Sequence, residues 1–228
     1  MCLLCRHKKY ILNLYNYNYV EKNNMIKFVY FDVGGVVVKD FSGTNKWNEL
    51  KNGMGIKPNQ EVVFDEIFDI YEPEVCIGRD VETLIPLLNT KLYLSLPENY
   101  SFLLDFVNRF ERNESIWPII KRIKERYKVG LLTNMYPNML NQIYKADLMP
   151  DTKWDVIIDS SIEKVRKPQI EMFKLAEDRS GFKGEEILFI ENGKKHIEAA
   201  NEFGWQTFLY DPSFTVESNK SLEETLLK

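Results

Sequence analysis

The sequence predicts an α/β protein, with a three-layer α/β/α core around a mostly parallel sheet and a small all-helical cap. Three observations predict this fold. Apolar runs of strand length alternate with helical patterns from about residue 113 to residue 211. One more such run, at 26–33, precedes a stretch from 42 to 112 in which only helical patterns occur. The chain has 228 residues, 44% hydrophobic and 28% charged, which is enough for one core domain and one small lid.

The predicted strands are short, and each is bounded by a turn or by the start of a helix. In chain order they are IKFVYFDV, KVGLLTN, WDVIIDS, EILFIEN and QTFLYD. Ser115 can cap the helix before the second strand, and Pro137 and Pro168 can open the helices after the second and third. The helix after the fourth strand ends at Gly204. The tail is polar, and we expect its Glu/Lys-rich end after Ser218 to be solvated.

The stretch from 42 to 112 carries three apolar stripes with the spacing of helices. They comprise Phe64, Ile67, Phe68 and Tyr71, then Val81, Leu84 and Leu88, then Phe102, Phe106 and Phe110. A helical block inserted directly after the first strand is best explained as a cap over the carboxyl ends of the strands, where sites in parallel sheets lie. The alternative is a helical extension that never touches the site.

The chain is therefore predicted to have three parts. Residues 1–24 are rich in Tyr and Asn and form an atypical N-terminal extension. The core comprises residues 25–41 and 113–228, and residues 42–112 form the cap. The abrupt change of character at Met25 suggests that this residue is the natural start, which mass spectrometry of the native protein would test.

Composition argues against several classes of protein. Lys and Arg number 30 against 34 Asp and Glu, so the net charge of -4 gives no general attraction to nucleic acid or to an anionic membrane. No segment is apolar enough to span a bilayer. Cys2 and Cys5 form a CxxC without the second pair that a zinc site needs, as expected for incidental thiols in a reducing cytoplasm. We expect a cytoplasmic monomer or homodimer.

Polar residues follow three of the predicted strands: Asp32, then Thr133 and Asn134, then Glu191 and Asn192. A carboxylate at the end of a buried strand, such as Asp32, is costly unless a cation or hydrogen bonds compensate it. Thr133 and Asn134 could cradle an oxyanion, whereas Glu191 and Asn192 offer the oxygen ligands that Mg²⁺ prefers. A carboxylate nucleophile, a metal and an oxyanion cradle together suggest phosphoryl transfer.

Three more residues fit the same chemistry. Gly34 and Gly35 let the backbone turn sharply and approach a ligand closely. They are not part of a GxGxxG, which argues against a nicotinamide-binding enzyme. Lys167 precedes a proline at a helix start, where its ammonium group and the helix N-terminus would both favour an anion.

Four segments carry a resemblance to a known family. FVYFDVGGVVV, GLLTN, RKPQIEMFKLA and ILFIENGKKHIEAANEFGWQTFLY resemble the four ordered motifs of the haloacid dehalogenase (HAD) superfamily. The resemblance extends from about Met25 to Asp211, and it is to phosphatase-like members with a helical cap after the first motif. It implies a Rossmann-like core.

The resemblance also implies a role for each site residue. Asp32 would be the nucleophile that forms an aspartyl phosphate, and Thr133, with Asn134, would bind the phosphoryl group. Lys167 would neutralise charge between Asp32 and the phosphoryl oxygens. Mg²⁺ would be held by Asp32, the backbone carbonyl of Gly34, Glu191 and Asn192. The implied activity is Mg²⁺-dependent hydrolysis of a small phosphorylated metabolite, either a sugar phosphate or a nucleotide.

Two departures from the family pattern keep alternatives open. Gly34 stands where the phosphatases of the family usually carry an Asp that acts as general acid and base. Loss of a general acid–base group typically slows an enzyme by about 10²–10⁴-fold. Glu191-Asn192 replaces the usual Asp-Asp pair. A weakened phosphate-binding pseudoenzyme and a 2-haloacid dehalogenase are therefore the alternatives. Asp40 could supply an acid, although nothing in the sequence places it, and His196 is expected to be structural or exposed.

Overall fold

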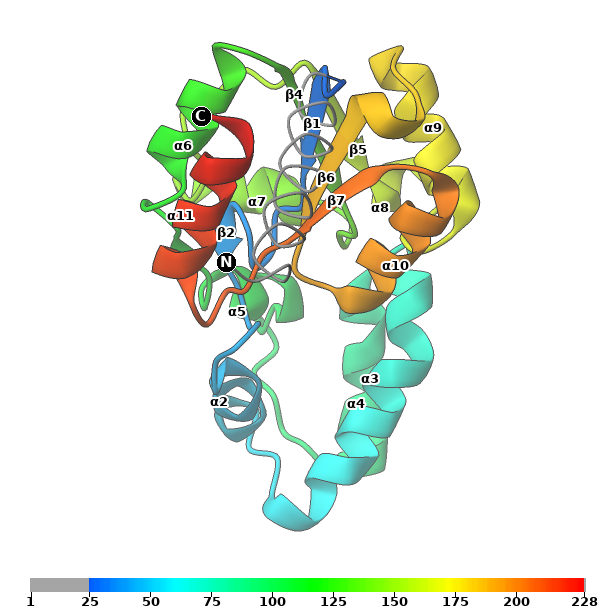
Figure 1. Cartoon of the computed structure of the whole chain (residues 1–228). Coiled ribbons are helices and arrows are strands. Elements are labelled where there is room, and N and C mark those ends of the chain that lie inside the picture. The colour runs from blue at the N-terminus through cyan, green and yellow to red at the C-terminus, as the bar shows by residue number, and fades with distance from the viewer. Residues whose placement is uncertain (1–24, 228) are drawn as a thin grey trace, which may run out of the picture.

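The computed structural model describes residues 25–227, and its centre is a five-stranded parallel sheet (Figure 1). The strand order β5-β4-β1-β6-β7 confirms the predicted α/β class. All four neighbouring pairs run parallel. The strands are β1 (Phe28–Phe31), β4 (Lys128–Thr133), β5 (Val156–Asp159), β6 (Ile187–Glu191) and β7 (Gln206–Leu209).

Helices cover both faces of the sheet, because the strands alternate their side chains between two apolar clusters. In β1, Val29 and Phe31 face one cluster and Phe28 and Tyr30 face the other. The first cluster includes side chains of α6 (Trp117–Lys124), α7 (Met139–Lys145) and α11 (Thr215–Leu226). The second includes side chains of α9 (Ile170–Ser180) and α10 (Lys194–Phe203). The result is the expected three-layer, Rossmann-like core (Figure 1).

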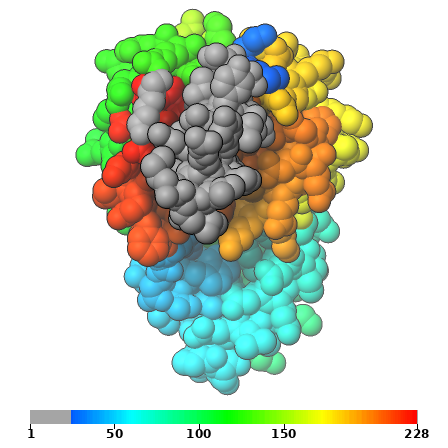
Figure 2. Space-filling model, viewed as in Figure 1, coloured from blue at the N-terminus to red at the C-terminus, as the bar shows by residue number. Residues whose placement is uncertain are grey.

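The segment between the first two long strands contains mainly helices, and it forms a lobe at one end of the core (Figures 1 and 2). Its elements are α2 (Lys46–Gly53), η1 (Pro58–Gln60), α3 (Glu61–Val75), η2 (Val81–Leu84), α4 (Ile85–Leu92) and α5 (Phe102–Val107). Aromatic rings hold the lobe together, with Trp47 packed against Phe64, Phe68 and Phe106. The exact division into core and cap stays a prediction.

Two short strands connect this lobe to the core. β2 (Val38–Lys39) and β3 (Glu111–Arg112) pair antiparallel. The segment that leaves the core for the lobe and the segment that returns therefore lie side by side. Glu111 and Arg112 end the segment 42–112, for which the sequence predicts only helices. Pairing the two crossings fixes where the chain leaves the core and where it returns.

The C-terminal tail differs from the expectation of a solvated end. Residues 215–226 form α11, which packs on α6, and Leu222 and Leu226 are buried. Ser218 and Asn219 are buried as well, and Asn219 accepts a hydrogen bond from the hydroxyl of Tyr210. The polar composition of this segment hides an apolar stripe with a four-residue spacing, so the prediction of a solvated end was wrong.

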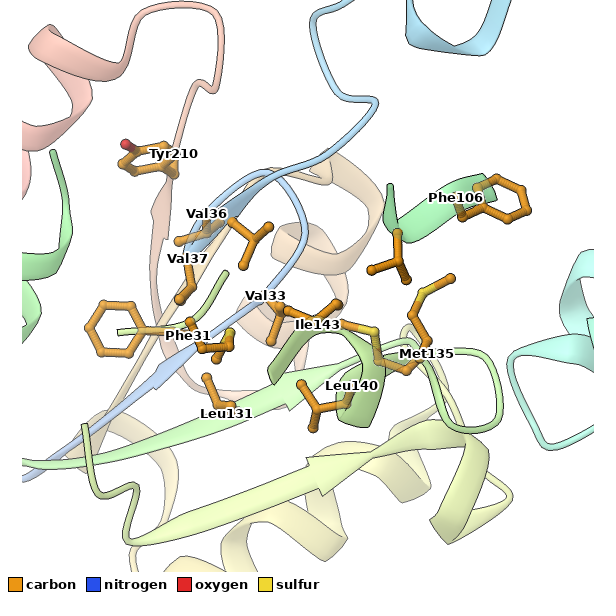
Figure 3. Close-up of a cluster of buried hydrophobic side chains, with 14 of the residues drawn as sticks. Phe31, Val33, Val36, Val37, Phe106, Leu131, Met135, Leu140, Ile143 and Tyr210 are labelled. Carbon is orange, nitrogen blue, oxygen red and sulfur yellow. The ribbon is translucent and has the colours of Figure 1, made fainter. Parts of the chain in front are cut away.

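The turn after β1 is anchored by apolar packing rather than by regular structure. Val33, Val36 and Val37 are fully buried in the first apolar cluster, where Val33 lies beside Ile143 of α7 (Figure 3). The amide of Val38 donates to the carbonyl of Val33, at 2.9 Å, and closes the turn. The site residues that flank this turn are therefore held on a rigid base.

A bilayer-crossing helix is absent from residues 25–227, where no helix combines the necessary length with the necessary apolarity.

Candidate active site

The sheet brings three of the predicted site residues to one edge. Asp32 follows β1 directly, and its amide donates to the carbonyl of Ile190 in β6 at 2.9 Å. Thr133 ends β4 and Glu191 ends β6. Because β1 lies between β4 and β6 in the strand order, Asp32 lies between the ends of the other two strands. Parallel strands place such residues at their common carboxyl edge, as expected.

Lys167 is fully buried beneath this edge. Its Nζ lies 2.9 Å from Oδ1 of Asp32 and 2.5 Å from Oε2 of Glu191. A single buried ammonium therefore neutralises part of the charge of two buried carboxylates. Removing the lysine would leave two buried carboxylates without a compensating charge.

Asn134 fixes the backbone that carries this lysine. Its Oδ1 accepts a hydrogen bond from the amide of Lys167 at 2.8 Å, and its Nδ2 donates to the carbonyl of Lys167 at 3.0 Å. The side chain is thus engaged with protein backbone rather than directed at a ligand. Its predicted contact with phosphate stays a prediction, and the structure adds a second role in positioning Lys167.

Glu191 is surrounded by donors from the protein. Its Oε1 accepts from the amides of Asn192, at 3.0 Å, and Gly193, at 2.8 Å. Its Oε2 contacts Lys167 and lies 3.2 Å from Nδ1 of His196. Direct binding of a cation would require Glu191 to give up one of these contacts, and its role as a metal ligand stays a prediction.

His196 is the residue that sequence reasoning missed. It lies in the first turn of α10, three residues after the N-cap residue Gly193. Its side chain lines the same cavity as Asp32. Side chains in a helix lean toward its N-terminus, so a His in this turn leans back toward the acid that ends the preceding strand. That spacing, five residues after Glu191, is the signal that would have found it.

Burial and mutual charge shift the titration of these groups. Burial raises the pKa of Asp32 to about 6, and the charge of Glu191 adds to the rise while Lys167 opposes it. Burial also raises the pKa of Glu191, but Lys167 and His196 outweigh burial and lower it to about 2. Burial lowers the pKa of Lys167, yet its two carboxylate neighbours prevail and raise it. The lysine is charged, Glu191 is ionised, and Asp32 is the group nearest to neutrality.

Thr133 presents a hydroxyl without a partner. The residue is buried at the end of β4, and its Oγ1 has no hydrogen-bond partner in the described part of the chain. An unpaired buried hydroxyl costs about 1–3 kcal/mol, so such groups usually serve a ligand or a bound water. Thr133 lies at the end of β4, next to the end of β1 that carries Asp32, and the sequence predicts that this residue contacts an oxyanion.

A comparison of the sequence with family models identifies the chain. The model of haloacid dehalogenase-like hydrolases matches residues 26–204. The chain belongs to this family. Membership of the HAD superfamily, expected from the four motifs, is confirmed, whereas the phosphatase-like subfamily stays a prediction. Asp32, Thr133 and Glu191 lie at strand ends, and Lys167 lies in the segment before α9.

Solved structures share the HAD fold at low sequence identity. An HAD-like family hydrolase from Porphyromonas gingivalis has a TM-score of 0.67 and 20% identity, over 87% of this chain and 98% of that one. An HAD family enzyme from Bacteroides thetaiotaomicron, in complex with magnesium and inorganic phosphate, has a TM-score of 0.65 and 17% identity, over 81% and 94%. An L-2-haloacid dehalogenase from Xanthobacter autotrophicus has a TM-score of 0.57 and 22% identity, over 81% and 77%. No curated protein matches the chain.

The HAD site opens into a cavity of about 600 Å³ between the strand ends and the helical lobe. Four carboxylates line it, those of Asp32, Asp40, Glu72 and Glu191. The opposite wall is aromatic, with Phe41, Trp47, Phe106, Phe110 and Tyr136. All the lining residues lie in the described part of the chain, and neither Lys nor Arg is among them. The cavity thus combines acidic and aromatic side chains, and the helical lobe contributes to both, with Glu72 of α3 and Trp47 of α2.

The donor set of the cavity fits a hard cation such as Mg²⁺. Asp32, Gly34 and Asn192 all line the cavity and carry carboxylate, carbonyl and amide oxygens. Within residues 25–227 no three His, Cys, Asp or Glu side chains are grouped to hold a metal ion by themselves. Mg²⁺ does not need such a cage, because it is usually held by one or two carboxylates, waters and the substrate phosphate.

Proposed function

We propose that this protein is a Mg²⁺-dependent phosphomonoesterase that acts through an aspartyl phosphate on Asp32. The observation that carries the proposal is the Asp32 carboxylate at the base of the cavity, held 2.9 Å from the buried ammonium of Lys167. The unpaired hydroxyl of Thr133 adds a donor for a phosphoryl oxygen. A carboxylate nucleophile, a fixed cation and a free donor are the parts that phosphoryl transfer requires.

The acidity of the cavity supports a role for a metal. Of the four carboxylates that line the cavity, Glu72 pairs with Arg166 at 3.6 Å, and Lys167 contacts Asp32 and Glu191. The two cations therefore do not balance the four negative charges that a phosphate dianion would meet. The oxygens of Asp32, Gly34 and Asn192 would hold the Mg²⁺, with Glu191 as a further candidate. When bound, the metal would supply positive charge to the phosphoryl oxygens and to the developing negative charge.

The residues of the chain then perform two displacements. In the first, an oxygen of Asp32 attacks phosphorus and the leaving-group oxygen departs, while Lys167 and Thr133 stabilise the phosphoryl oxygens. In the second, water attacks the phosphorus of the aspartyl phosphate, which releases inorganic phosphate and restores Asp32. Asn134 contributes by holding Lys167 in place.

The lining of the cavity favours an uncharged leaving group. With no Lys or Arg in the lining, a second phosphate or a carboxylate on the substrate would find no cation partner. Trp47, Phe106 and Phe110 instead offer flat apolar surfaces to a sugar or a nucleoside. The same feature disfavours the 2-haloacid dehalogenase alternative, because a 2-haloacid carries a carboxylate.

A substrate screen with and without Mg²⁺ tests this proposal. We expect phosphate release from sugar monophosphates, nucleoside monophosphates and p-nitrophenyl phosphate with Mg²⁺ and none without it. 2-Chloropropionate, supplied as the dehalogenase probe, is expected to release no chloride. Chloride release without metal would overturn the proposal in favour of the dehalogenase, and phosphate binding without turnover would favour the pseudoenzyme.

Replacing the buried hydroxyl of Thr133 separates ligand binding from stability. We expect Thr133→Val to weaken product inhibition by inorganic phosphate about fivefold, because one phosphoryl contact of about 1 kcal/mol is lost. The free energy of unfolding in urea should not fall, since the hydroxyl has no partner in the folded protein. The control is Thr83→Val, where the hydroxyl donates to Asp80 and accepts from Arg79. A loss of stability in Thr133→Val as large as in the control would contradict this account.

A further inference from the structure

The main departure from the family pattern is the missing acid at position 34. A hydrolase of this kind needs a group that gives a proton to the leaving oxygen and later takes one from water. Gly34 has no side chain to do so, and the sequence offers Asp40 as a candidate without placing it near the site. The structure, however, places another carboxylate at this position.

Asp40 occupies the space that a side chain on residue 34 would take. A Cβ atom on Gly34 would lie 2.5 Å from Oδ2 of Asp40 and 3.3 Å from its carboxyl carbon. Real Cβ atoms do not approach other atoms so closely, so a side chain at position 34 would displace the Asp40 carboxylate from its present place. Both Asp40 and Asp32 line the cavity.

The turn after β1 brings this carboxylate back to Gly34. The amide of Gly35 donates to the carbonyl of Val38 at 2.8 Å, and residues 33–38 fold into a compact turn. Beyond it, Oδ1 of Asp40 accepts from the amide of Ser42 at 2.8 Å, which leaves Oδ2 as the oxygen near Gly34. The hydroxyl of Ser42 in turn accepts from Nδ2 of Asn192 at 3.0 Å. The loop that carries Asp40 is therefore tied to the fourth motif.

We propose that Asp40 is the general acid–base residue of this enzyme, and that its carboxyl group replaces the one missing at position 34. The proposal rests on the proposed phosphomonoesterase function. As the bond between phosphorus and the leaving oxygen breaks and the bond to Asp32 forms, the Asp40 carboxylic acid gives its proton to the leaving oxygen. The Asp40 carboxylate then takes a proton from the water that attacks phosphorus, which restores both groups. The net reaction converts a phosphomonoester and water into an alcohol and inorganic phosphate.

Leaving-group dependence tests this role. Phenyl phosphate needs a proton on its departing oxygen more than p-nitrophenyl phosphate, whose phenolate is stable. We expect Asp40→Asn, which keeps an acceptor for Ser42, to lower kcat/KM about 10²–10⁴-fold for phenyl phosphate and about tenfold or less for p-nitrophenyl phosphate, because kcat/KM reports the step that expels the leaving group. Asp69→Asn, on the exposed face of α3, should leave both rates unchanged. Circular dichroism and urea unfolding report whether each variant is folded.

Relocating the carboxylate provides a second, independent test. In Gly34→Asp/Asp40→Ala the new side chain has the space that Asp40 vacates. We expect this variant to regain about tenfold or more of the phenyl phosphate rate that Asp40→Ala loses. Gly34→Asn/Asp40→Ala, which has the same shape without an acid, should regain nothing. Gly34→Asp alone should be slower than the unmodified protein, because its side chain displaces Asp40.

Each outcome supports or overturns a stated claim. Equal losses of kcat/KM on both substrates in Asp40→Asn, or no loss at all, would overturn the assignment of Asp40. The phosphomonoesterase proposal would survive that result if Asp32→Asn remained inactive. Absence of phosphate release from the unmodified protein on the whole substrate panel would overturn both proposals.

Discussion

Asp32→Asn is expected to abolish phosphate release while leaving the protein folded. An amide cannot act as the nucleophile that forms the acyl phosphate, so we expect kcat to fall by about 10⁴–10⁶-fold, as for loss of a covalent nucleophile elsewhere. The measurement is phosphate release from p-nitrophenyl phosphate with Mg²⁺, at enzyme concentrations high enough to detect a residual rate.

The stability of Asp32→Asn should depend on pH in a defined direction. The folded protein raises the pKa of Asp32 from 3.8 to about 6, mainly through burial. The stability that this group contributes is therefore present below pH 4 and is lost as the pH rises through about 6. Without added metal, Asp32→Asn should be more stable than the unmodified protein at pH 7, and this advantage should shrink toward pH 4. A variant that is less stable at pH 7 would contradict the assigned environment.

Lys167→Met is expected to have the largest effect on stability. Its ammonium group is fully buried and contacts both Asp32 and Glu191. Removing it leaves two buried carboxylates facing each other, and such a loss typically costs about 3–5 kcal/mol. Urea unfolding at pH 7 measures the loss, which should be smaller at lower pH, where a carboxylate can take up a proton. Phosphate release should be lost as well.

Lys51 offers a matched control within the same chain. It is also buried and also contacts two carboxylates, those of Asp65 at 3.0 Å and Glu61 at 3.2 Å. Those carboxylate side chains are 42% and 35% exposed, so water can solvate them once the lysine is gone. Lys51→Met should therefore cost about 1 kcal/mol. Equal costs for the two substitutions would show that the site cluster is no more demanding than an ordinary ion pair.

The parts of the fold that follow from local patterns could be predicted from the sequence. Apolar runs of strand length place Asp32, Thr133 and Glu191 at strand ends, and parallel pairing then brings strand ends together. The sequence predicts Lys167 as a site residue from its place before a proline near a helix start. Its burial between two carboxylates could not be predicted in this way. One-dimensional periodicity thus predicts which residues reach the edge of the sheet.

The contacts between side chains could not be predicted, because they depend on turns and on non-local packing. Asp40 returns to Gly34 only through the geometry of the turn at 33–38, which no spacing rule describes. Asn134 lines the cavity, but both ends of its amide bind the backbone of Lys167, 33 residues away. The helix at 215–226 was missed because its buried stripe is partly polar.

The central claim is that Asp32 forms a covalent bond to the phosphoryl group. The most direct measurement is acid quenching of the protein during turnover of p-nitrophenyl phosphate with Mg²⁺, followed by mass spectrometry of its peptides. We expect a phosphoryl group on the peptide that contains Asp32, sensitive to hydroxylamine as an acyl phosphate should be, and absent from Asp32→Asn. Turnover with no phosphoryl group on that peptide, or equal labelling in the variant, would contradict the account.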